Sequence, residues 1–337
     1  YVPAAGEPVR IVHSVEGTLL DHLPGKRLVY YSRKQLIELL GELEGGTIGV
    51  QYSKELTGIS YLDHGTALLL EEAGFTLRPS ASLIQKTIGI LRPEQITSHK
   101  KTAVQLYDIV ELMWTVIQTS AKNDKTVTEG EIRDRIMEEF SRRDLTTDHT
   151  PIVAAGANSS DPHYTATGKG EMLKKSDILQ LDLFARENAP GSIYADISWV
   201  GVFDSTVPTH IEKTFKTVKT AREKAVAFIN SRLSAGKDVL GSEVDELVRS
   251  FLSSEGYAEA IRHRTGHSID TQIHGSGVNI DCVEFPDHRR IIEGSCFSIE
   301  PGVYLQEFGL RTEIDVVISG GRAVVSGKKP QEQLLVL

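Results

Sequence analysis

Several features that would assign a function directly are missing from this sequence. It has no stretch of about 18 uninterrupted apolar residues, which excludes an ordinary transmembrane helix. Its first residues, YVPAAGEPVR, lack a signal-peptide pattern, so we expect a cytoplasmic protein that does not interact with membranes. Because the chain opens on Tyr1 rather than Met, we expect its true start to lie upstream.

Cysteine and the common catalytic motifs are also scarce. The only two cysteines, Cys282 and Cys296, have no secretory context and are expected to stay reduced. The absence of CxxC, HExxH, GxSxG and GxxxxGK(S/T) excludes zinc ribbons, zincins, serine hydrolases and P-loop proteins. The net charge of -9 is spread along the chain, which argues against a nucleic-acid partner. Any chemistry must therefore come from dispersed residues.

The 337 residues, 40% of them hydrophobic, favour two domains over one. Residues 1–92 alternate short β-rich runs with helical runs, as in a small α/β domain. After Pro93 the apolar spacing becomes that of a long helix. We therefore expect an amino-terminal α/β domain at 1–92, incomplete at its start, and a catalytic domain at 93–337.

An internal near-repeat runs through the second part. Helix-like segments near 128–143 and 242–254 each open with a hydroxyl residue three positions before an acid, as in a capping box: Thr128 with Glu131, and Ser242 with Asp245. Their apolar positions match at an offset of 112 residues: Ile132, Ile136 and Phe140, against Val244, Val248 and Leu252. The sequence therefore predicts two similar halves.

The repeat continues into strands that carry acids. The run DILQLD ends in Asp182 and the run SCFSIE ends in Glu300, 118 residues later. A second acid follows each, Asp196 and Glu313, at an offset of 117 residues. Most single acids are solvated surface residues, but four at matched positions in apolar strands need compensating cations if they are buried. Two divalent ions would supply the compensation.

Histidines cluster between the two acid pairs. His263, His267 and His274 fall within HRTGHSIDTQIHG, where Gly266 and Gly275 indicate close backbone approaches. A single histidine is usually an ordinary core or surface residue, but this clustering favours a role in the same site. A set of four carboxylates and one imidazole favours Mn, Co, Fe or Zn over copper. Two such ions can share a water and activate it to attack a carbonyl.

The order Asp, Asp, His, Glu, Glu resembles that of the pita-bread metallopeptidase family (M24), which includes methionine aminopeptidase, aminopeptidase P and prolidase. The matching runs are DPHY, DLF with YADIS, GHS to IHG, SIEPG and GLRTEID, and they span most of 150–320. The resemblance implies a mixed α/β (α+β) fold, in which a pita-bread domain with a pseudo-two-fold duplication follows a creatinase-like amino-terminal domain.

The resemblance also implies roles for individual residues. Two divalent ions, with Mn as first choice and Co, Zn or Fe as others, would be held by Asp182, Asp196, His267, Glu300 and Glu313. Glu300 would also be the general base. His163 and His274 would line the substrate site and stabilise or protonate the tetrahedral intermediate. His263 would lie near the residue after the scissile bond, and Arg311 would orient an acidic ligand or the substrate carboxylate.

The proline-directed branch fits best, because the front residues resemble its smaller domain. The expected activity is hydrolysis of the bond between an amino-terminal residue and a following proline, through a metal-bridging hydroxide, by a homodimer that acts on short peptides. Alternatives are a methionine or general aminopeptidase, an amidine hydrolase, or a silent peptide-binding module. In two places the chain departs from the family: Phe184 replaces a glycine, and Trp199 with Val200 replaces Arg-Thr. We expect Trp199 to reshape one wall of the site.

Overall fold

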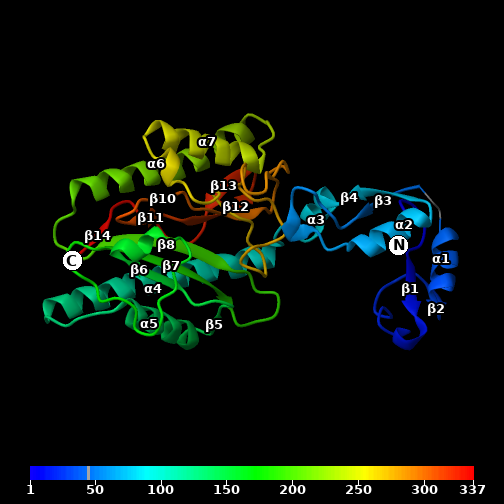
Figure 1. The fold of residues 1–337 in the computed structure, drawn as a ribbon, viewed down its shortest axis with the longest axis horizontal. Helices are drawn as coiled ribbons and strands as arrows, with labels where there is room; N and C mark the ends of the chain where they lie inside the picture. The colour runs from blue at the N-terminus through cyan, green and yellow to red at the C-terminus, as the bar shows by residue number, and fades with distance from the viewer. Residues whose placement is uncertain (44–45) are drawn as a thin grey trace. The chain divides into compact units, whose positions relative to one another are not determined.

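The chain forms two compact units in a computed structural model that describes residues 1–43 and 46–337 (Figure 1). The first unit is Tyr1–Ala81 and the second is Ser82–Leu337. The division therefore precedes the expected boundary at Arg92. The reason is that the intervening segment is attached to the second unit, where the Gln85 side-chain amide donates to the carbonyl of Arg290 at 2.6 Å.

The first unit contains the strands and helices that its alternating sequence pattern predicts. Strands β1 and β2 pair in parallel, and so do β3 and β4, in two separate two-stranded sheets. The elements are β1 (Val9–His13), β2 (Lys26–Tyr30), α1 (Arg33–Gly41), β3 (Gly46–Val50), α2 (His64–Glu72) and β4 (Phe75–Pro79). Helix α3 (Ala81–Thr87) begins at the last residue of the first unit, and the rest of it belongs to the second.

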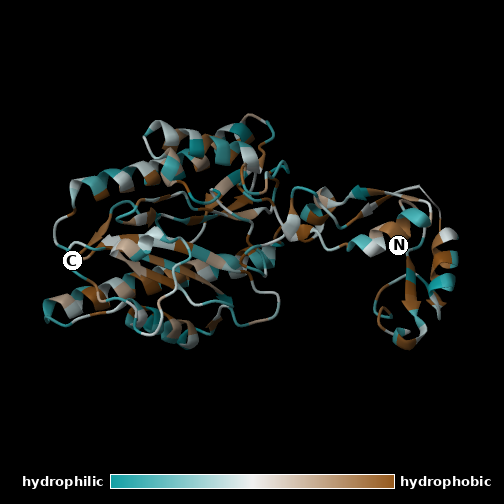
Figure 2. Cartoon of the chain, viewed as in Figure 1, coloured by the Kyte–Doolittle hydropathy of each residue, from teal (hydrophilic) through white to brown (hydrophobic). Residues whose placement is uncertain are grey.

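The second unit places its strands between two layers of helices. Figure 1 shows α4 and α5 on one side of the strands and α6 and α7 on the other. The helices are α4 (Pro93–Lys122), α5 (Glu129–Arg142), α6 (Thr209–Ser234) and α7 (Gly241–Ser254). Hydrophilic and hydrophobic residues alternate along them in Figure 2, because each helix buries one face against the strands and exposes the other.

The strands form two main sheets, one for each half. The first half supplies β5 (Leu145–Thr146), β6 (Ile152–Ala155), β7 (Ile178–Glu187) and β8 (Ala195–Val202), and the carboxyl-terminal strand β14 (Leu335–Val336) joins β8. The second half supplies β9 (Cys296–Ile299), β12 (Ile314–Ser319) and β13 (Arg322–Val325), in the order β13-β12-β9. A small hairpin of β10 (Gly302–Tyr304) and β11 (Gly309–Arg311) falls between β9 and β12 in the sequence.

The predicted duplication is confirmed in three dimensions. Helices α5 and α7 bury the equivalent apolar positions that the sequence matched, each against its own sheet. The loop before each acid-bearing hairpin contains a left-handed residue at the same relative position: Ser176, with φ of 69°, and Gly294, with φ of 81°. Backbone bridges also correspond, since Thr128 pairs with Met172 and Leu240 with Arg290. The two halves therefore share helix, loop and strand geometry.

One detail of the predicted helix starts is wrong. Thr128 and Glu131 do form a capping box on α5. Helix α7, however, begins after Leu240, and it is Glu243 that accepts a hydrogen bond from the Leu240 amide at 2.9 Å. Asp245 instead turns its carboxylate toward residues distant in the sequence.

Two further expectations concern the cysteines and membrane spans. Cys282 and Cys296 are both free thiols, as expected. Among the described residues, no helix combines the length and the apolar character needed to cross a membrane.

Candidate metal centre

The four matched acids meet where the two main sheets join. Asp182 lies on β7 and Asp196 on β8, its antiparallel partner. Glu300 directly follows β9, and Glu313 directly precedes β12. The two hairpins are linked because the Glu313 amide donates to the carbonyl of Ser198 at 3.1 Å. Each half thus delivers one pair of carboxylates to a common point.

His267 completes this group. Its Nε2 lies 3.6 Å from an Asp196 oxygen and 3.4 Å from a Glu300 oxygen. Ligand atoms of Asp196, His267 and Glu313 all lie within 4.8 Å of one another. The backbone before His267 packs closely on β9, since a Cβ on Gly266 would lie 2.0 Å from the carbonyl oxygen of Ser298. This contact explains the glycine that precedes the histidine.

The carboxylates carry more negative charge than their protein partners neutralise. Burial, followed by the charges of Asp182 and Glu300, raises the pKa of Asp196 well above its usual range. Burial and the same group of neighbouring acids raise the pKa of Glu313. One oxygen of each of these two side chains is buried without a hydrogen-bond partner in the described protein. Buried polar atoms are normally satisfied, so this donor set fits divalent cations.

Arg311 is engaged by protein groups rather than left free. Its Nη2 lies 2.5 Å from an Asp182 oxygen, Nε donates to the Ser198 hydroxyl at 3.0 Å, and Nη1 donates to the Tyr304 hydroxyl at 2.8 Å. Arg311 therefore holds the Asp182 carboxylate directly.

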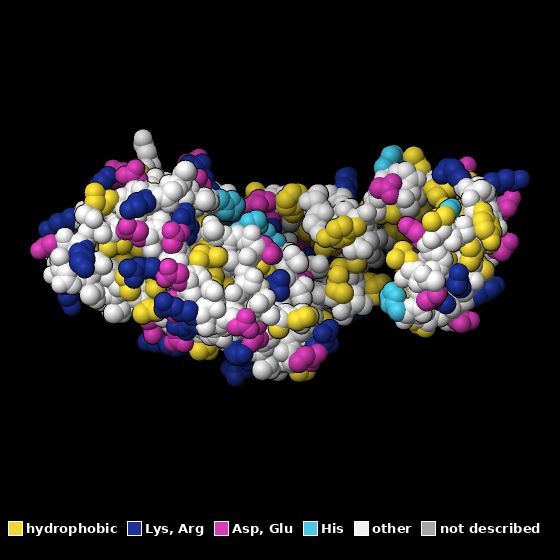
Figure 3. Space-filling model, turned by 90° about the horizontal axis from the view of Figure 1, so that it is seen from below, with side chains coloured by type: hydrophobic (Ala, Val, Ile, Leu, Met, Phe, Trp, Pro, Cys, Tyr) yellow, Lys and Arg dark blue, Asp and Glu magenta, His cyan; other side chains and the backbone are white. Residues whose placement is uncertain are grey.

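Three further histidines lie around the metal centre. Burial is the largest cause that lowers the pKa of His263, the charge of His267 is the largest cause that lowers the pKa of His274, and the charge of His163 contributes to both shifts. The rings of His274 and His267 meet edge to face, with centroids 4.4 Å apart. His163 and His274 are exposed, whereas His267 is buried. Figure 3 shows histidine side chains gathered on one face of the second unit.

His263 is held in one tautomer. Its Nδ1 lies 2.7 Å from the carbonyl oxygen of Arg264, which can only accept, so Nδ1 carries the proton. Its Nε2 then accepts from the Tyr304 hydroxyl at 2.7 Å. Burial lowers the pKa of His263 to about 3, which keeps the ring neutral near pH 7. Arg311, Tyr304 and His263 therefore form one donor chain.

Several residues of this site could not be found by searching for acids and histidines. The Ser198 hydroxyl bridges Asp182 and Glu313 at 2.8 and 3.0 Å. The Ser298 hydroxyl donates to Glu300 at 3.2 Å and accepts from the His267 amide at 3.0 Å. The only sequence signal was strand alternation, because each serine lies two positions from an acid of the same strand segment.

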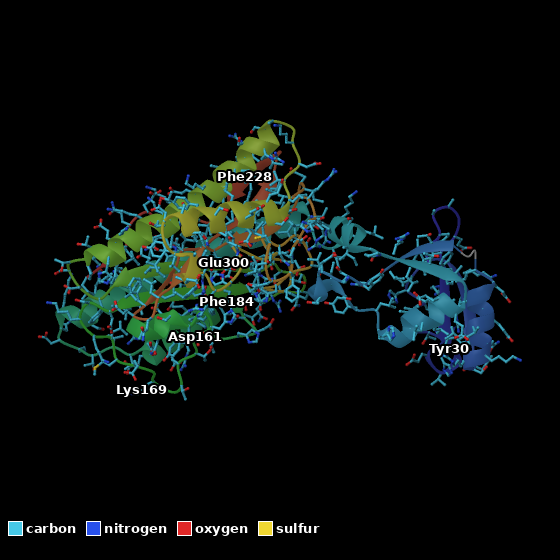
Figure 4. All side chains as sticks on the ribbon, turned by 45° about the horizontal axis from the view of Figure 1, so that its top comes forward. Tyr30, Asp161, Lys169, Phe184, Phe228 and Glu300 are labelled. Carbon is cyan, nitrogen blue, oxygen red and sulfur yellow. The ribbon has the colours of Figure 1, made fainter. Side chains whose placement is uncertain are left out.

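Trp199 does not form a wall of the site, and that expectation is wrong. Ser198 faces the acids, so the next residue on the strand faces away from them. The Trp199 ring packs edge to face on Tyr107 of α4, with ring centroids 5.7 Å apart. Phe184, in contrast, is two residues from Asp182 on the same strand face and pairs with Asp196. It lies in the middle of the unit, as does Glu300 (Figure 4).

We therefore predict that Trp199→Phe changes kcat/KM by less than about twofold, the range expected for a change outside the site. Among the described residues the Trp199 indole nitrogen is buried without a hydrogen-bond partner, so phenylalanine removes a donor that these residues do not satisfy. Phe184→Leu serves as the comparison, because it changes a side chain on the acid-bearing face. Steady-state kinetics on a series of peptides would test both, and a large effect of Trp199→Phe would contradict the placement.

Comparison with known proteins finds a matching family and several relatives. The profile of metallopeptidase family M24 matches residues 101–320. The uncharacterized peptidase YqhT of Bacillus subtilis (strain 168) is 29% identical over 191 residues, which are 55% of this chain and 48% of that protein. An Xaa-Pro dipeptidase of Lactobacillus delbrueckii subsp. lactis is 27% identical over 175 residues, 50% of this chain and 42% of the relative. The chain thus spans about half the length of these curated relatives.

Solved structures extend the likeness over nearly the whole chain. The dipeptidase PepE from Mycobacterium ulcerans superposes with a TM-score of 0.76 at 20% identity, covering 99% of this chain and 85% of that chain. The similarity shows that the two-unit fold is shared.

Proposed function

Because the chain belongs to metallopeptidase family M24, we propose that it is a metal-dependent exopeptidase that hydrolyses the bond between an amino-terminal residue and a following proline. One observation carries the proposal: four buried or half-buried carboxylates and one imidazole from both halves converge, with two carboxylate oxygens left without partners. The relative from Lactobacillus delbrueckii, named an Xaa-Pro dipeptidase, supports the proline preference.

Two divalent ions, with Mn as first choice, would be held by Asp182, Asp196, His267, Glu300 and Glu313. When bound, such ions polarise a carbonyl and lower the pKa of a coordinated water. The absence of thiolates from the set fits Mn, Co, Fe or Zn. Ser198 and Arg311 each donate one hydrogen bond to the Asp182 carboxylate, and Arg311 also donates to the Ser198 hydroxyl, so this proposed ligand is held in place from two sides.

The remaining residues would handle the proton and the substrate. Glu300 would take a proton from the attacking water and pass it to the proline nitrogen, which must gain a proton to leave as an amine when the C–N bond breaks. The Ser298 hydroxyl orients the accepting carboxylate. His163 and His274 would face the substrate carbonyl, where an imidazole N–H stabilises developing negative charge. His263, held neutral by burial and by Tyr304, would line the side that receives the leaving residue.

A substrate panel tests the proposal. Protein loaded with Mn would be incubated with Xaa-Pro dipeptides, Xaa-Pro-Yaa tripeptides and Met-Ala peptides, and products would be separated by chromatography. We expect cleavage only where proline is second. Cleavage of dipeptides alone would identify a dipeptidase, and cleavage of tripeptides as well would identify an aminopeptidase. Failure to cleave any proline peptide would refute the proposal.

His274→Ala should lower kcat on the best peptide of that panel by roughly a hundredfold, the usual effect of removing one stabilising donor. Because His274 is exposed and is not among the proposed metal ligands, the bound Mn per chain should stay near the wild-type value. Kinetics together with elemental analysis would check both. Activity at the wild-type level would remove His274 from the mechanism.

A further inference from the structure

Glu129, the first residue of α5, has a carboxylate that is fully buried. It accepts four hydrogen bonds: from the amides of Ala155 and Glu171 at 2.8 Å each, from the Asn158 side chain at 3.0 Å and from the Tyr164 hydroxyl at 2.8 Å. All four donors are uncharged. A buried carboxylate is costly unless its oxygens are hydrogen-bonded, so these four donors determine where it can lie.

The four donors share a location that bears on the site. They all belong to residues 155–171, which we call the His163 segment because His163 lies at its middle. Arg133, one turn further along α5, adds donations to the carbonyls of Ala166 at 2.7 Å and Gly168 at 3.2 Å. On its other side the same segment contacts the metal centre, where the Pro162 carbonyl accepts from Arg311 at 3.3 Å. Helix α5 thus ties the His163 segment to the fold.

The duplicated helix α7 does the same for the opposite half. Asp245, at the position equivalent to Arg133, is fully buried. Its carboxylate accepts from the Thr265 amide at 3.0 Å, the Thr265 hydroxyl at 2.6 Å and the Cys282 amide at 2.8 Å, and also from Arg249 at 2.9 Å.

Thr265 connects Asp245 to the ligands. It lies two residues before His267, and its carbonyl accepts from the Glu300 amide at 2.8 Å. Arg249 extends the same support by donating to the carbonyl of His263 at 2.8 Å.

We infer that Glu129 and Asp245 are positioning residues for the proposed reaction: Glu129 places His163 toward the substrate, and Asp245 places the backbone that carries His267 and receives Glu300. Neither side chain is itself a proposed ligand or proton carrier. Helix α5 thereby positions a residue on the substrate side of the site, and the equivalent helix α7 positions residues on the metal side. The inference rests on the proposed function for its catalytic meaning, while the two anchoring networks can be measured without activity.

The Glu129 arm is tested by Glu129→Gln, with Glu138→Gln as the matched control, because Glu138 is an exposed glutamate on the same helix. The side-chain amide introduced by Glu129→Gln accepts fewer hydrogen bonds than the carboxylate and leaves at least one donor of the His163 segment unpaired. The rate of backbone hydrogen exchange, measured by mass spectrometry, should therefore rise in peptides covering 156–171. It should not change in Glu138→Gln. Unchanged exchange in Glu129→Gln would overturn the inference whatever the enzyme does.

A double-mutant cycle then connects the segment to catalysis. We expect Glu129→Gln to lower kcat about tenfold with Mn content unchanged, as for other residues that support a site from outside it. In a His163→Ala background the same substitution should cost nothing further, because its effect passes through His163. Losses that simply multiply would indicate a purely structural role and overturn the assignment. Wild-type protein inactive on every proline peptide would refute the proposed function, but not the exchange result.

The Asp245 arm has a different readout. Asp245→Asn should weaken Mn binding to metal-stripped protein by 10- to 100-fold, the range for residues that orient metal ligands, measured by titration calorimetry with Mn alone. Exposed Glu246 on the same helix gives the control Glu246→Gln. If Asp245→Asn does not fold, Thr265→Val removes only the hydroxyl donation and should weaken binding in the same direction. Unaltered Mn affinity in the folded variants would overturn this arm.

Discussion

Glu300→Gln should lower kcat by about a thousandfold, within the range of 10²–10⁴ that a positioned general base contributes. Glutamine keeps the size and one carbonyl oxygen of the side chain, but it cannot accept the proton that the reaction releases. KM should change little, because the histidines on the substrate side are untouched. Ser298 can still donate to the remaining oxygen, so the local geometry is kept.

The measurement is steady-state kinetics on an Xaa-Pro peptide with parallel analysis of bound Mn. Glu307→Gln provides the control, since Glu307 is an exposed glutamate of the same half. Should Glu300→Gln keep more than a tenth of the wild-type kcat while binding normal amounts of Mn, Glu300 would not be the base. A loss that coincides with loss of Mn would instead assign Glu300 to metal binding alone.

Metal removal should abolish activity and also lower the melting temperature. In the protein without ions, the pKa values of Asp196 and Glu313 are raised by burial and by neighbouring acids. A carboxyl group whose pKa is higher folded than unfolded destabilises the fold as the pH rises above its unfolded value of about 4. The stripped protein therefore loses stability between acid and neutral pH, and bound cations offset that loss.

We expect Mn at a hundred times its dissociation constant to stabilise the fold by about 2.7 kcal/mol, which corresponds to a rise in Tm of roughly 5–10 °C for a unit of this size. The rise should be larger at pH 7.5 than at pH 5, because protons compete with the cation for the same carboxylates. Calorimetric melting with and without Mn at both pH values checks this, with NaCl at matched ionic strength as the control. Equal shifts at the two pH values would contradict the proposed ligand set.

The convergence of the four acids could be predicted from the sequence because two signals coincide at them. Asp182 and Glu300 end apolar runs at equivalent places in a duplicated pattern, so buried charge and symmetry pointed to the same residues. Their hydrogen-bond partners could not be predicted. Whether Ser198 meets Asp182 depends on the pairing register of β7 with β8, and register is a property of two strands together.

The two wrong expectations have separate causes. The placement of Trp199 came from its departure from the family pattern, although the alternation that puts Asp196 and Ser198 on one face already puts Trp199 on the other. The cap predicted at Ser242 failed for a tertiary reason. The Asp245 carboxylate accepts hydrogen bonds from the amides of Thr265 and Cys282 instead. These long-range hydrogen bonds outweigh a local capping preference of about 1 kcal/mol.

The amino-terminal unit shows where local patterning suffices. Its strands and helices follow the alternation of apolar runs because each is short and bounded by turn residues. The start of the second unit does not follow local patterning. Helix α3 precedes the change of pattern at Pro93, and its attachment through Gln85 to Arg290 joins residues that are far apart in the chain.

The meeting of Asp196 and Glu313 has a mechanical consequence. One comes from the first half and the other from the second, and the hairpins that carry them are linked by the hydrogen bond from Glu313 to Ser198. Any ion bound between these carboxylates would link the two halves of the second unit at the interface between them, which we call the seam. Neither half could retain it alone. Loss of the ions should therefore loosen the seam first, so that the halves part before either one melts.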